Sequence, residues 1–263
     1  MLEDKNAIIY GAAGAVGGAV ARAFAQQGAQ LFLTGRTLSK VEALASEIRK
    51  NGGRAEAALV DALDEQAVES HAADVVKRAG SIDVSFNAIT PIPQPGTQGI
   101  PLAMLSVESF TAPISAYARS HFLTSRAAAR RMVDKGSGVI LMHTPEPARL
   151  GAPLTGGMSL AWAAMEALNR NLSAELAAKG IRSVVLRSSG LPETATIDVV
   201  YGLHAKAIGI TPEAFRQMLE GFSHRHRSTT LAEVANAAVF VTSDLGSGLT
   251  GTVVNLTGGL IVD

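Results

Sequence analysis

Short apolar runs alternate with amphipathic stretches along this chain of 263 residues. The apolar runs have the length of buried strands, and they cover residues 7–10, 30–34, 57–60, 84–87, 139–143, 183–187 and 252–256. Apolar residues recur at helical spacing over residues 16–27, 39–51, 64–79, 117–135, 159–179 and 231–242. Strands that alternate with helices predict an α/β fold of the Rossmann type. We expect a doubly wound parallel sheet of about seven strands with helices on both faces, as one domain over residues 1–263.

Two segments interrupt this alternation. Residues 90–104 contain four prolines, which exclude a helix before Ser106. Residues 191–228 are irregular, with a short helix expected over residues 212–219 behind the capping residue Thr211. Both segments follow strands, and open α/β sheets bind ligands at the carboxyl ends of their strands. We therefore expect residues 191–228 to form a lid over a substrate.

Composition narrows the possible partners. The chain has 23 basic and 23 acidic residues, and a net charge of zero provides little attraction for nucleic acid. Without cysteine there is no disulfide, zinc thiolate site or thiol nucleophile. No uncharged run reaches the ~18 strongly apolar residues of a membrane-spanning helix. These features predict a cytoplasmic protein that binds neither nucleic acid nor a membrane.

A glycine-rich turn connects the first predicted strand to the first helix. The strand runs directly into Gly11, and residues 12–18 that follow are alanine, valine and glycine only. Gly11 permits a tight turn, the small residues let backbone N–H groups approach a pyrophosphate, and the helix N-terminus favours an anion. Close packing of helix on strand is the alternative explanation. The strand before the turn and the helix after it favour a dinucleotide site.

The second strand is followed by Gly35 and Arg36. An acidic residue at this place would bind the ribose 2′-hydroxyl of NAD, whereas an arginine can bind the 2′-phosphate of NADP. A solvated arginine at a helix start is the alternative. The sequence favours NADP over NAD.

Further segments match one family. They are Gly11-x3-Ala15-x-Gly17, Val60-Asp61, Phe86-Asn87-Ala88, Gly190-x3-Thr194 and residues 231–235 and 250–255. Over essentially its whole length the chain thereby resembles the short-chain dehydrogenase/reductases. The resemblance implies that Asp61 holds the adenine amino group and that Thr194 contacts the nicotinamide carboxamide. The cofactor site it implies consists of Gly11, Ala13, Gly14, Ala15, Val16, Gly17, Arg36, Asp61, Ala62, Asn87, Ala88, Ile89, Trp162, Gly190 and Thr194.

The catalytic half of the family pattern is different here. The family uses a Tyr as proton donor, a Lys four residues later, a Ser that holds the substrate oxygen and an Asn that supports the Lys. Aligning residues 175–182 with the family's matching helix end places these four on Met158, Trp162, Pro145 (or Thr144 with a one-residue slip) and Tyr117. None of the three tyrosines has a lysine four residues later. Methionine has no transferable proton, and tryptophan is a donor without cationic charge.

Other groups are candidate substitutes. His143 and Thr144 end the fifth predicted strand, where the nicotinamide is expected, and Tyr117 is the one tyrosine that the alignment brings near. Each has a structural alternative: a packed histidine, a strand-end cap and an aromatic between helices. Trp162 either stacks on the nicotinamide or packs in the core. Glu146 and Arg149 are expected to be solvated.

The run His224-Arg225-His226-Arg227 resembles a metal or anion site, but no acidic or Cys partner is evident nearby. A basic, exposed hinge before the last helix is the alternative that we favour. We predict no metal site.

Two functions remain. The first is an NADP-dependent oxidoreductase that acts on a small carbonyl, enone or alcohol by hydride transfer with a non-standard proton relay. The second is a non-catalytic dinucleotide-binding protein, either a redox sensor or an inactive subunit of a hetero-oligomer. The alanine-rich helices at residues 117–135 and 159–179 correspond to the dimer face of the family. A homotetramer or homodimer is the expected assembly.

Overall fold

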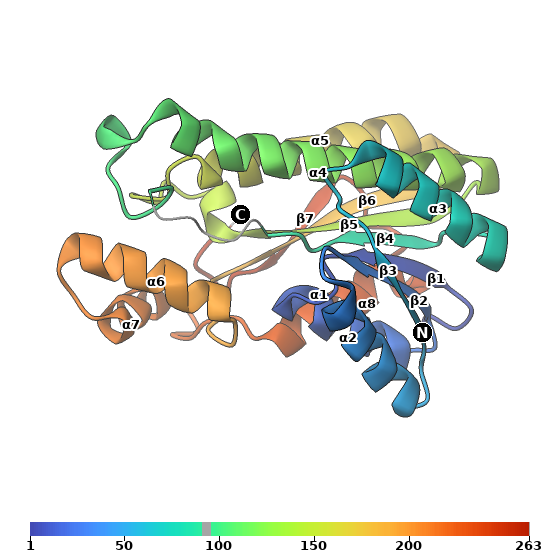
Figure 1. Cartoon of the computed structure of the whole chain (residues 1–263). Helices are drawn as coiled ribbons and strands as arrows, with labels where there is room; N and C mark the ends of the chain where they lie inside the picture. Colours follow the sequence, from blue (N-terminus) through green and yellow to red (C-terminus); the bar gives the residue numbers. More distant parts are fainter. Residues whose placement is uncertain (91–95, 263) are drawn as a thin grey trace.

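The computed structural model describes residues 1–90 and 96–262. Within them, seven parallel strands form one sheet in the order β3-β2-β1-β4-β5-β6-β7 (Figure 1). The strands are β1 (Asn6–Tyr10), β2 (Gln30–Gly35), β3 (Arg54–Leu59), β4 (Val84–Asn87), β5 (Gly138–Pro145), β6 (Ile181–Ser188) and β7 (Thr252–Leu256). The predicted fold class is confirmed.

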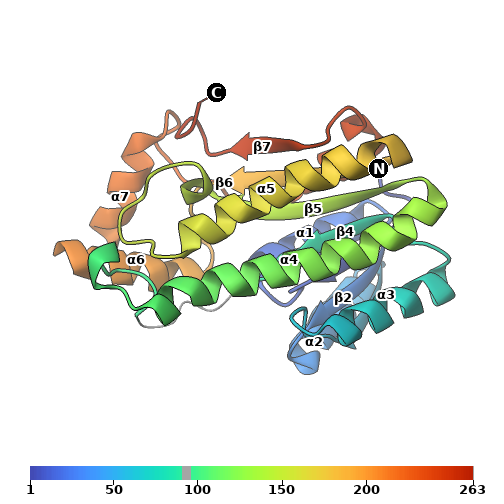
Figure 2. The same cartoon turned by 90° about the horizontal axis from the view of Figure 1, so that it is seen from above.

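Helices cover both faces of the sheet. One face carries α1 (Ala15–Gln26), α2 (Leu38–Lys50) and α8 (Leu231–Thr242), and the other carries α3 (Glu65–Ala79), α4 (Val107–Lys135) and α5 (Met158–Leu176) (Figures 1 and 2). Two further helices, α6 (Ala195–Ile208) and α7 (Pro212–Phe222), lie beyond the carboxyl ends of the strands. Among the described residues, no helix combines the length and the apolar character that crossing a membrane requires.

The central strand β1 shows why the strands are apolar throughout. Ala7 and Ile9 pack in a core with α1, α2 and α8, whereas Ile8 and Tyr10 pack in a second core with α3, α4 and α5. Alternate side chains of a strand point to opposite faces, and here both faces are covered. Each position of the strand is therefore buried.

Two elements begin earlier than the sequence pattern predicts. The third strand, expected over residues 57–60, starts at Arg54, because Arg54 already pairs with Gln30 of β2. The helix expected over residues 117–135 starts at Val107 and contains Pro113. Ser106 caps this helix by accepting a hydrogen bond from the N–H of Ser109. A start at Val107 agrees with the prediction that the prolines exclude this helix before Ser106.

The segment 191–228 is more regular than expected. The predicted helix at residues 212–219 exists with Thr211 as its cap, and it extends to Phe222. The prediction missed α6, because its sequence is apolar nearly all round and shows no clear stripe. The two helices pack on each other through a small apolar cluster that includes Tyr201, Ala205 and Phe215.

A buried ion pair links α5 to the sheet. Glu166 of α5 receives two hydrogen bonds from the Arg187 guanidinium of β6, at 2.8 and 2.7 Å, and both side chains are at most 7% exposed. Thr144 of β5 donates a third bond to the same carboxylate, at 3.0 Å. Thr144 and Arg187 are partners in the sheet register, so the three groups join β5, β6 and α5 at one point.

Breaking this pair is expected to destabilise the protein strongly. Arg187→Met leaves the Glu166 carboxylate buried without its cation and should lower the free energy of unfolding by about 3–5 kcal/mol in urea titrations. The double variant Glu166→Leu/Arg187→Met removes both charges and should recover most of that loss.

The half-exposed pair of Arg22 and Glu47 is the matched control. Arg22→Met should cost less than about 1 kcal/mol, because solvent screens this pair. Equal losses for Arg22→Met and Arg187→Met would contradict a special role for the buried pair.

Candidate functional site

The carboxyl edge of the sheet brings together the residues that the sequence assigned to a cofactor. Gly11 directly follows β1, Arg36 directly follows β2, and Asp61 lies two residues after β3. Asn87 ends β4 and pairs with Tyr10 across the point where the strand order reverses. Crevices at such switch points are where open α/β sheets bind ligands.

The glycine-rich turn fits closely against the neighbouring strand end. Gly11 has a φ of +74°, and a Cβ on it would lie 3.1 Å from the backbone of Ala88 and from the Ile89 side chain. A Cβ on Gly17 would lie 2.5 Å from the carbonyl oxygen of Gly11. Close packing, the alternative explanation of the glycines, therefore also requires a glycine at position 17.

The same turn has the features of an anion cradle. Gly14 is the N-cap residue of α1 and provides no side-chain cap, and the first turn of the helix has no acidic residue. Ala13, Gly14 and Ala15 are exposed, whereas Val16 is half-buried. The first N–H groups of a helix have no intrahelical partner and carry partial positive charge, so an open turn of this kind fits a pyrophosphate.

Two side chains flank the turn on the β2 and β3 side. Arg36 is exposed and has no hydrogen-bond or ion-pair partner among residues 1–90 and 96–262. Asp61 is also exposed, and its carboxylate accepts the N–H of Leu63 at 3.0 Å. Ala62, which follows Asp61, is 2% exposed.

On the other side, Asn87 shapes the strand end. Its side-chain oxygen accepts the N–H of Ile89 at 2.9 Å, and its amide donates to Thr124 at 3.0 Å. Thr194 is the cap of α6, and its hydroxyl donates to the carbonyl of Leu191 at 2.9 Å. Gly190 is buried beside Tyr201 of α6.

The positions that align with the family's Tyr, Lys and Asn form one cluster. Met158 and Trp162 are the first and fifth residues of α5. The Trp162 ring packs edge to face on the Tyr117 ring of α4, with the ring centroids 6.2 Å apart. Met158 and Tyr117 are almost fully buried in the same core. Burial raises the pKa of Tyr117 to about 12, while hydrogen bonds with Trp162 and Thr90 act in the opposite direction.

The other two candidates already have partners within the protein. His143 Nε2 lies 2.9 Å from the Ser188 hydroxyl, and burial lowers the pKa of His143 to about 4. The imidazole is therefore neutral near pH 7. Thr144 is fully buried and donates its proton to Glu166, so its oxygen can still accept but its proton is committed.

The expectation for Glu146 is wrong. Its Oε2 atom is enclosed and has no hydrogen-bond partner in the described part of the chain, and burial raises the pKa of this carboxyl to about 7. Glu146 begins the short 3-10 turn Glu146–Ala148, and its half-buried side chain lines a small cavity with Ser189 and Gly190. Arg149 is exposed, as expected.

Sequence reasoning also missed Glu166 and Arg187. A signal was present, because Arg187 stands inside an apolar strand and Glu166 inside an otherwise apolar turn of helix. A charge at such a position is paired in most proteins.

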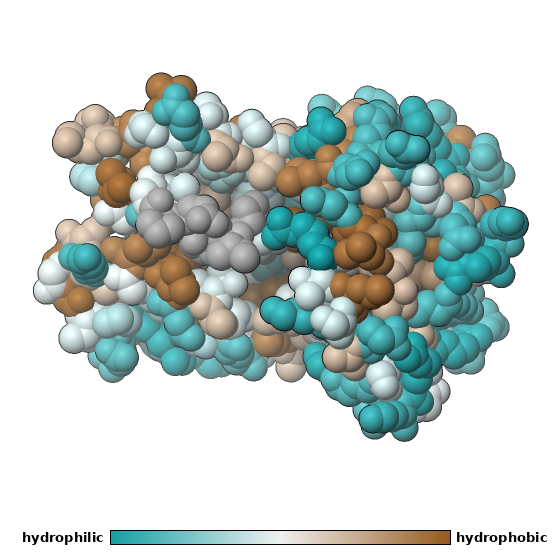
Figure 3. All heavy atoms as spheres, viewed as in Figure 1, coloured by the Kyte–Doolittle hydropathy of each residue, from teal (hydrophilic) through white to brown (hydrophobic). Residues whose placement is uncertain are grey.

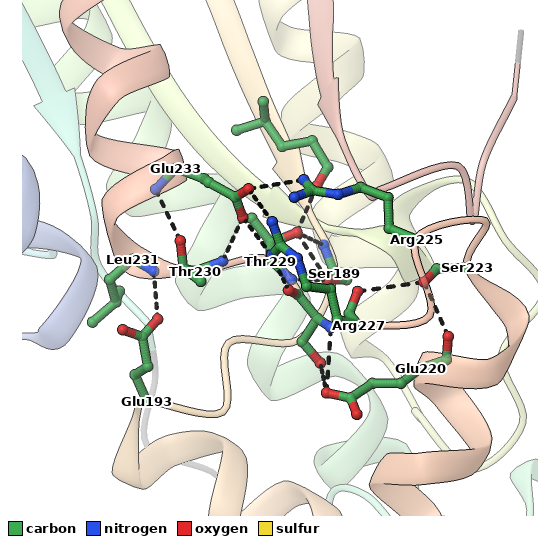
Figure 4. A network of polar contacts seen from close by, with 12 residues as sticks. Ser189, Glu193, Glu220, Ser223, Arg225, Arg227, Thr229, Thr230, Leu231 and Glu233 are labelled. Atoms are coloured by element: carbon green, nitrogen blue, oxygen red, sulfur yellow. Dashed lines mark hydrogen bonds and ion pairs between the residues drawn. The ribbon is translucent and has the colours of Figure 1, made fainter.

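The run from His224 to Arg227 connects α7 to α8 and belongs to a polar network (Figure 4). Arg225 and Arg227 both pair with Glu233, at 2.8 and 2.6 Å, whereas His224 and His226 are exposed. Over the residues that the structure describes, no three His, Cys, Asp or Glu side chains are grouped to hold a metal ion.

Comparison with known proteins gives the same family throughout. The family model described as enoyl-(acyl carrier protein) reductase matches residues 11–261. The chain is 31% identical to the uncharacterized oxidoreductase YxbG of Bacillus subtilis over 261 residues, which cover 99% of this chain and 92% of that protein. It is 29% identical to 2,3-dihydro-2,3-dihydroxybenzoate dehydrogenase of the same species, over 95% of this chain and 93% of that protein.

Solved structures share the fold at lower identity. An NAD⁺-bound xylitol dehydrogenase superposes with a TM-score of 0.92 at 22% identity, covering 98% of this chain and 99% of the other. Gluconate 5-dehydrogenase from Burkholderia cenocepacia, in complex with NADP and tartrate, gives a TM-score of 0.86 at 24% identity, covering 98% and 96%. By its sheet order, its glycine turn and these matches, the chain belongs to the short-chain dehydrogenase/reductase family of NAD(P)-dependent oxidoreductases.

Proposed function

We propose that the protein is an NADP-dependent oxidoreductase whose proton relay does not use the family's Tyr–Lys pair. The observation that carries the NADP preference is the exposed Arg36, which has no partner among residues 1–90 and 96–262 and lies at the same sheet edge as the uncapped N-terminus of α1. A 2′-phosphate placed there would gain a charge-assisted contact, and the first turn of α2 has no acidic residue that would repel it.

The residues along the sheet edge would divide the cofactor between them. The turn from Gly11 to Gly17 would hold the pyrophosphate, Arg36 the 2′-phosphate, and Asp61 with Ala62 the adenine. Asn87, Ala88, Ile89, Gly190, Thr194 and Trp162 would surround the nicotinamide half. The bound nicotinamide supplies or accepts the hydride, and the protein positions it and manages the proton.

Met158 supports an unusual relay, because a thioether at the family's donor position cannot deliver a proton. Tyr117, His143 and Thr144 are the substitutes proposed from sequence. Thr144 would accept a hydrogen bond from a hydroxyl, since its own proton goes to Glu166. The neutral His143 could donate or accept near the end of β5.

Exposed apolar side chains near α6 and the start of α4 support a small organic substrate. Leu102, Met104 and Val107 before and at the start of α4 are 63–76% exposed, and Val199 of α6 is 50% exposed. In Figure 3 the end that carries α6 and the start of α4 shows apolar surface beside polar surface. We take residues 191–228 as a lid over a small carbonyl, enone or alcohol.

Self-association is part of the proposal. Phe122 on α4 and Leu160 on α5 are about half exposed, next to Ala163 and Ala164, which are also exposed. These two helices lie side by side on the outer face (Figure 2). An apolar helix pair of this kind suits burial in a homodimer or homotetramer.

The NADP preference can be measured by titration with NADPH and then NADH, following emission of the single tryptophan, Trp162. Wild type should bind NADPH more tightly, with quenching by energy transfer to the nicotinamide. Arg36→Ser should weaken NADPH binding about 10- to 100-fold, as expected for the loss of a charge-assisted contact, and leave NADH binding nearly unchanged. Lys40→Ser, one turn into α2, is the control and should change neither constant by more than about two-fold.

Hydride transfer can be followed directly. NADPH deuterated at C4 is incubated with a panel of small aldehydes, ketones, quinones and enones, and the products are analysed by mass spectrometry. We expect at least one product to be one mass unit heavier than the same product formed with unlabelled NADPH. Tight NADPH binding without transfer to any compound would favour the non-catalytic alternative, a redox sensor or an inactive subunit.

A further inference from the structure

One oxygen of the half-buried Glu146 side chain lies enclosed, without a hydrogen-bond partner among the described residues, just after the end of β5. Glu146 follows Pro145, which pairs with Ser188 in the sheet, so Glu146 extends beyond the sheet edge beside Ser189 and Gly190. Its Oε2 atom is almost inaccessible and makes no hydrogen bond within residues 1–90 and 96–262. The carboxyl lines a cavity of about 10 Å³, close to the size of one water molecule.

The lid segment covers this cavity. Tyr201 of α6 and Leu219 of α7 line it together with Glu146 and Gly190. The Tyr201 phenol lies so close to Gly190 that a Cβ there would be 2.2 Å from the phenol oxygen. Phe215 packs edge to face on Tyr201, with the ring centroids 5.4 Å apart. Side chains of the lid segment therefore help to enclose the Oε2 atom of Glu146.

Within residues 1–90 and 96–262, Glu146 forms no ion pair. The charged and titratable groups that face the cavity are Tyr201 from α6, Glu220 from α7 and Arg227 from the loop before α8. Arg227 forms two hydrogen bonds with Glu233, at 3.0 and 2.6 Å (Figure 4). Glu220 accepts hydrogen bonds from Ser228 and Arg216. A buried carboxyl without a cation prefers to carry its proton.

We propose that Glu146 is the catalytic acid and base of this site, in the place of the family's tyrosine. This role rests on the proposed oxidoreductase function. In reduction, a hydride from the nicotinamide adds to the carbonyl carbon with its two electrons. The O–H bond of Glu146 breaks as the O–H bond of the product alcohol forms, and the carboxylate regains a proton from water when the lid opens. In oxidation the same proton moves in the reverse direction.

The other candidates are less suited to the task. Burial places the pKa of Glu146 at about 7, where a group can both give and take a proton, whereas the pKa of Tyr117 is about 12 and that of His143 about 4. The proton of Thr144 is held by Glu166. Glu146 is also next in sequence to Pro145, the position that aligns with the family's substrate-binding serine.

The first test measures melting temperature against pH and needs no cofactor. The pKa of Glu146 is raised in the folded state from about 4.5 to about 7, so the folded protein binds more protons than the unfolded chain between these values. This contribution is fully present below pH 4.5 and is lost as the pH rises through 7. Glu146→Gln removes it, so the melting temperature of the variant relative to wild type should rise by about 5 °C between pH 5 and pH 8.

Glu220→Gln is the matched control, because Glu220 lines the same cavity but its carboxylate is paired and its pKa is lowered. This variant should show no such relative rise. A constant difference between Glu146→Gln and wild type across this range would overturn the proposal, because Glu146 would then titrate as a solvated carboxyl.

The second test is kinetic and uses the compound of the carbonyl panel that wild type reduces fastest. Glu146→Gln should lower kcat about 10²- to 10⁴-fold and abolish the pH dependence near pH 7. The dissociation constant for NADPH should change less than about two-fold, and Glu146→Asp should restore part of kcat. Full activity with an unchanged pH midpoint in Glu146→Gln overturns the role of Glu146 and leaves the oxidoreductase function intact. If wild type reduces no compound of the panel, the proposed function fails, and the role of Glu146 fails with it.

Discussion

The parallel pairing of β1 with β4 is the interaction on which the rest of the site depends. Parallel strands buried on both faces require helical crossovers, and these return the chain so that every strand ends at the same edge. Because the strand order reverses between β1 and β4, the connections after these two strands leave toward opposite faces. The glycine turn after Tyr10 and the segment after Asn87 then border one crevice. No side chain in the crevice has to attract the others, since the sheet already places them.

Two acidic side chains near the end of β5 have opposite environments. The Arg187 guanidinium and the Glu166 carboxylate are buried together, and Thr144 completes their hydrogen bonding. Such a pair contributes little net attraction once desolvation is counted, but it penalises any arrangement that separates β5, β6 and α5. The Glu146 carboxyl differs, because its enclosed Oε2 atom has no hydrogen-bond partner among the described residues. A protein tolerates an unpaired carboxyl of this kind most readily when the group carries a proton, which is also the state that an acid catalyst needs.

The fold and the chemistry of this chain have separate origins. The family's cofactor-binding segments are present from Gly11 to Thr194, whereas the alignment from sequence predicts Met158 and Trp162 at the tyrosine and lysine positions. These two side chains pack with Tyr117 in one apolar cluster. Conserving the scaffold while moving the proton-transfer group is physically simple, because the hydride comes from the cofactor and only the proton donor has to be supplied by the protein.

The sequence by itself determined the strands, the glycine turn and the exposed Arg36, because these depend on local periodicity and on backbone geometry that only glycine tolerates. It also predicted Met158 and Trp162 at the positions of the family's tyrosine and lysine. Tertiary structure alone decided that α6 is a helix, since its apolar surface packs on α7 and shows no stripe in the sequence. It also decided the environment of the Glu146 side chain. A glutamate in a proline-rich loop looks solvated from its neighbours in sequence, and its environment is set by Gly190, Tyr201 and Leu219, which lie far along the chain. Desolvation depends on all atoms around a group, and for this reason no local pattern could have revealed it.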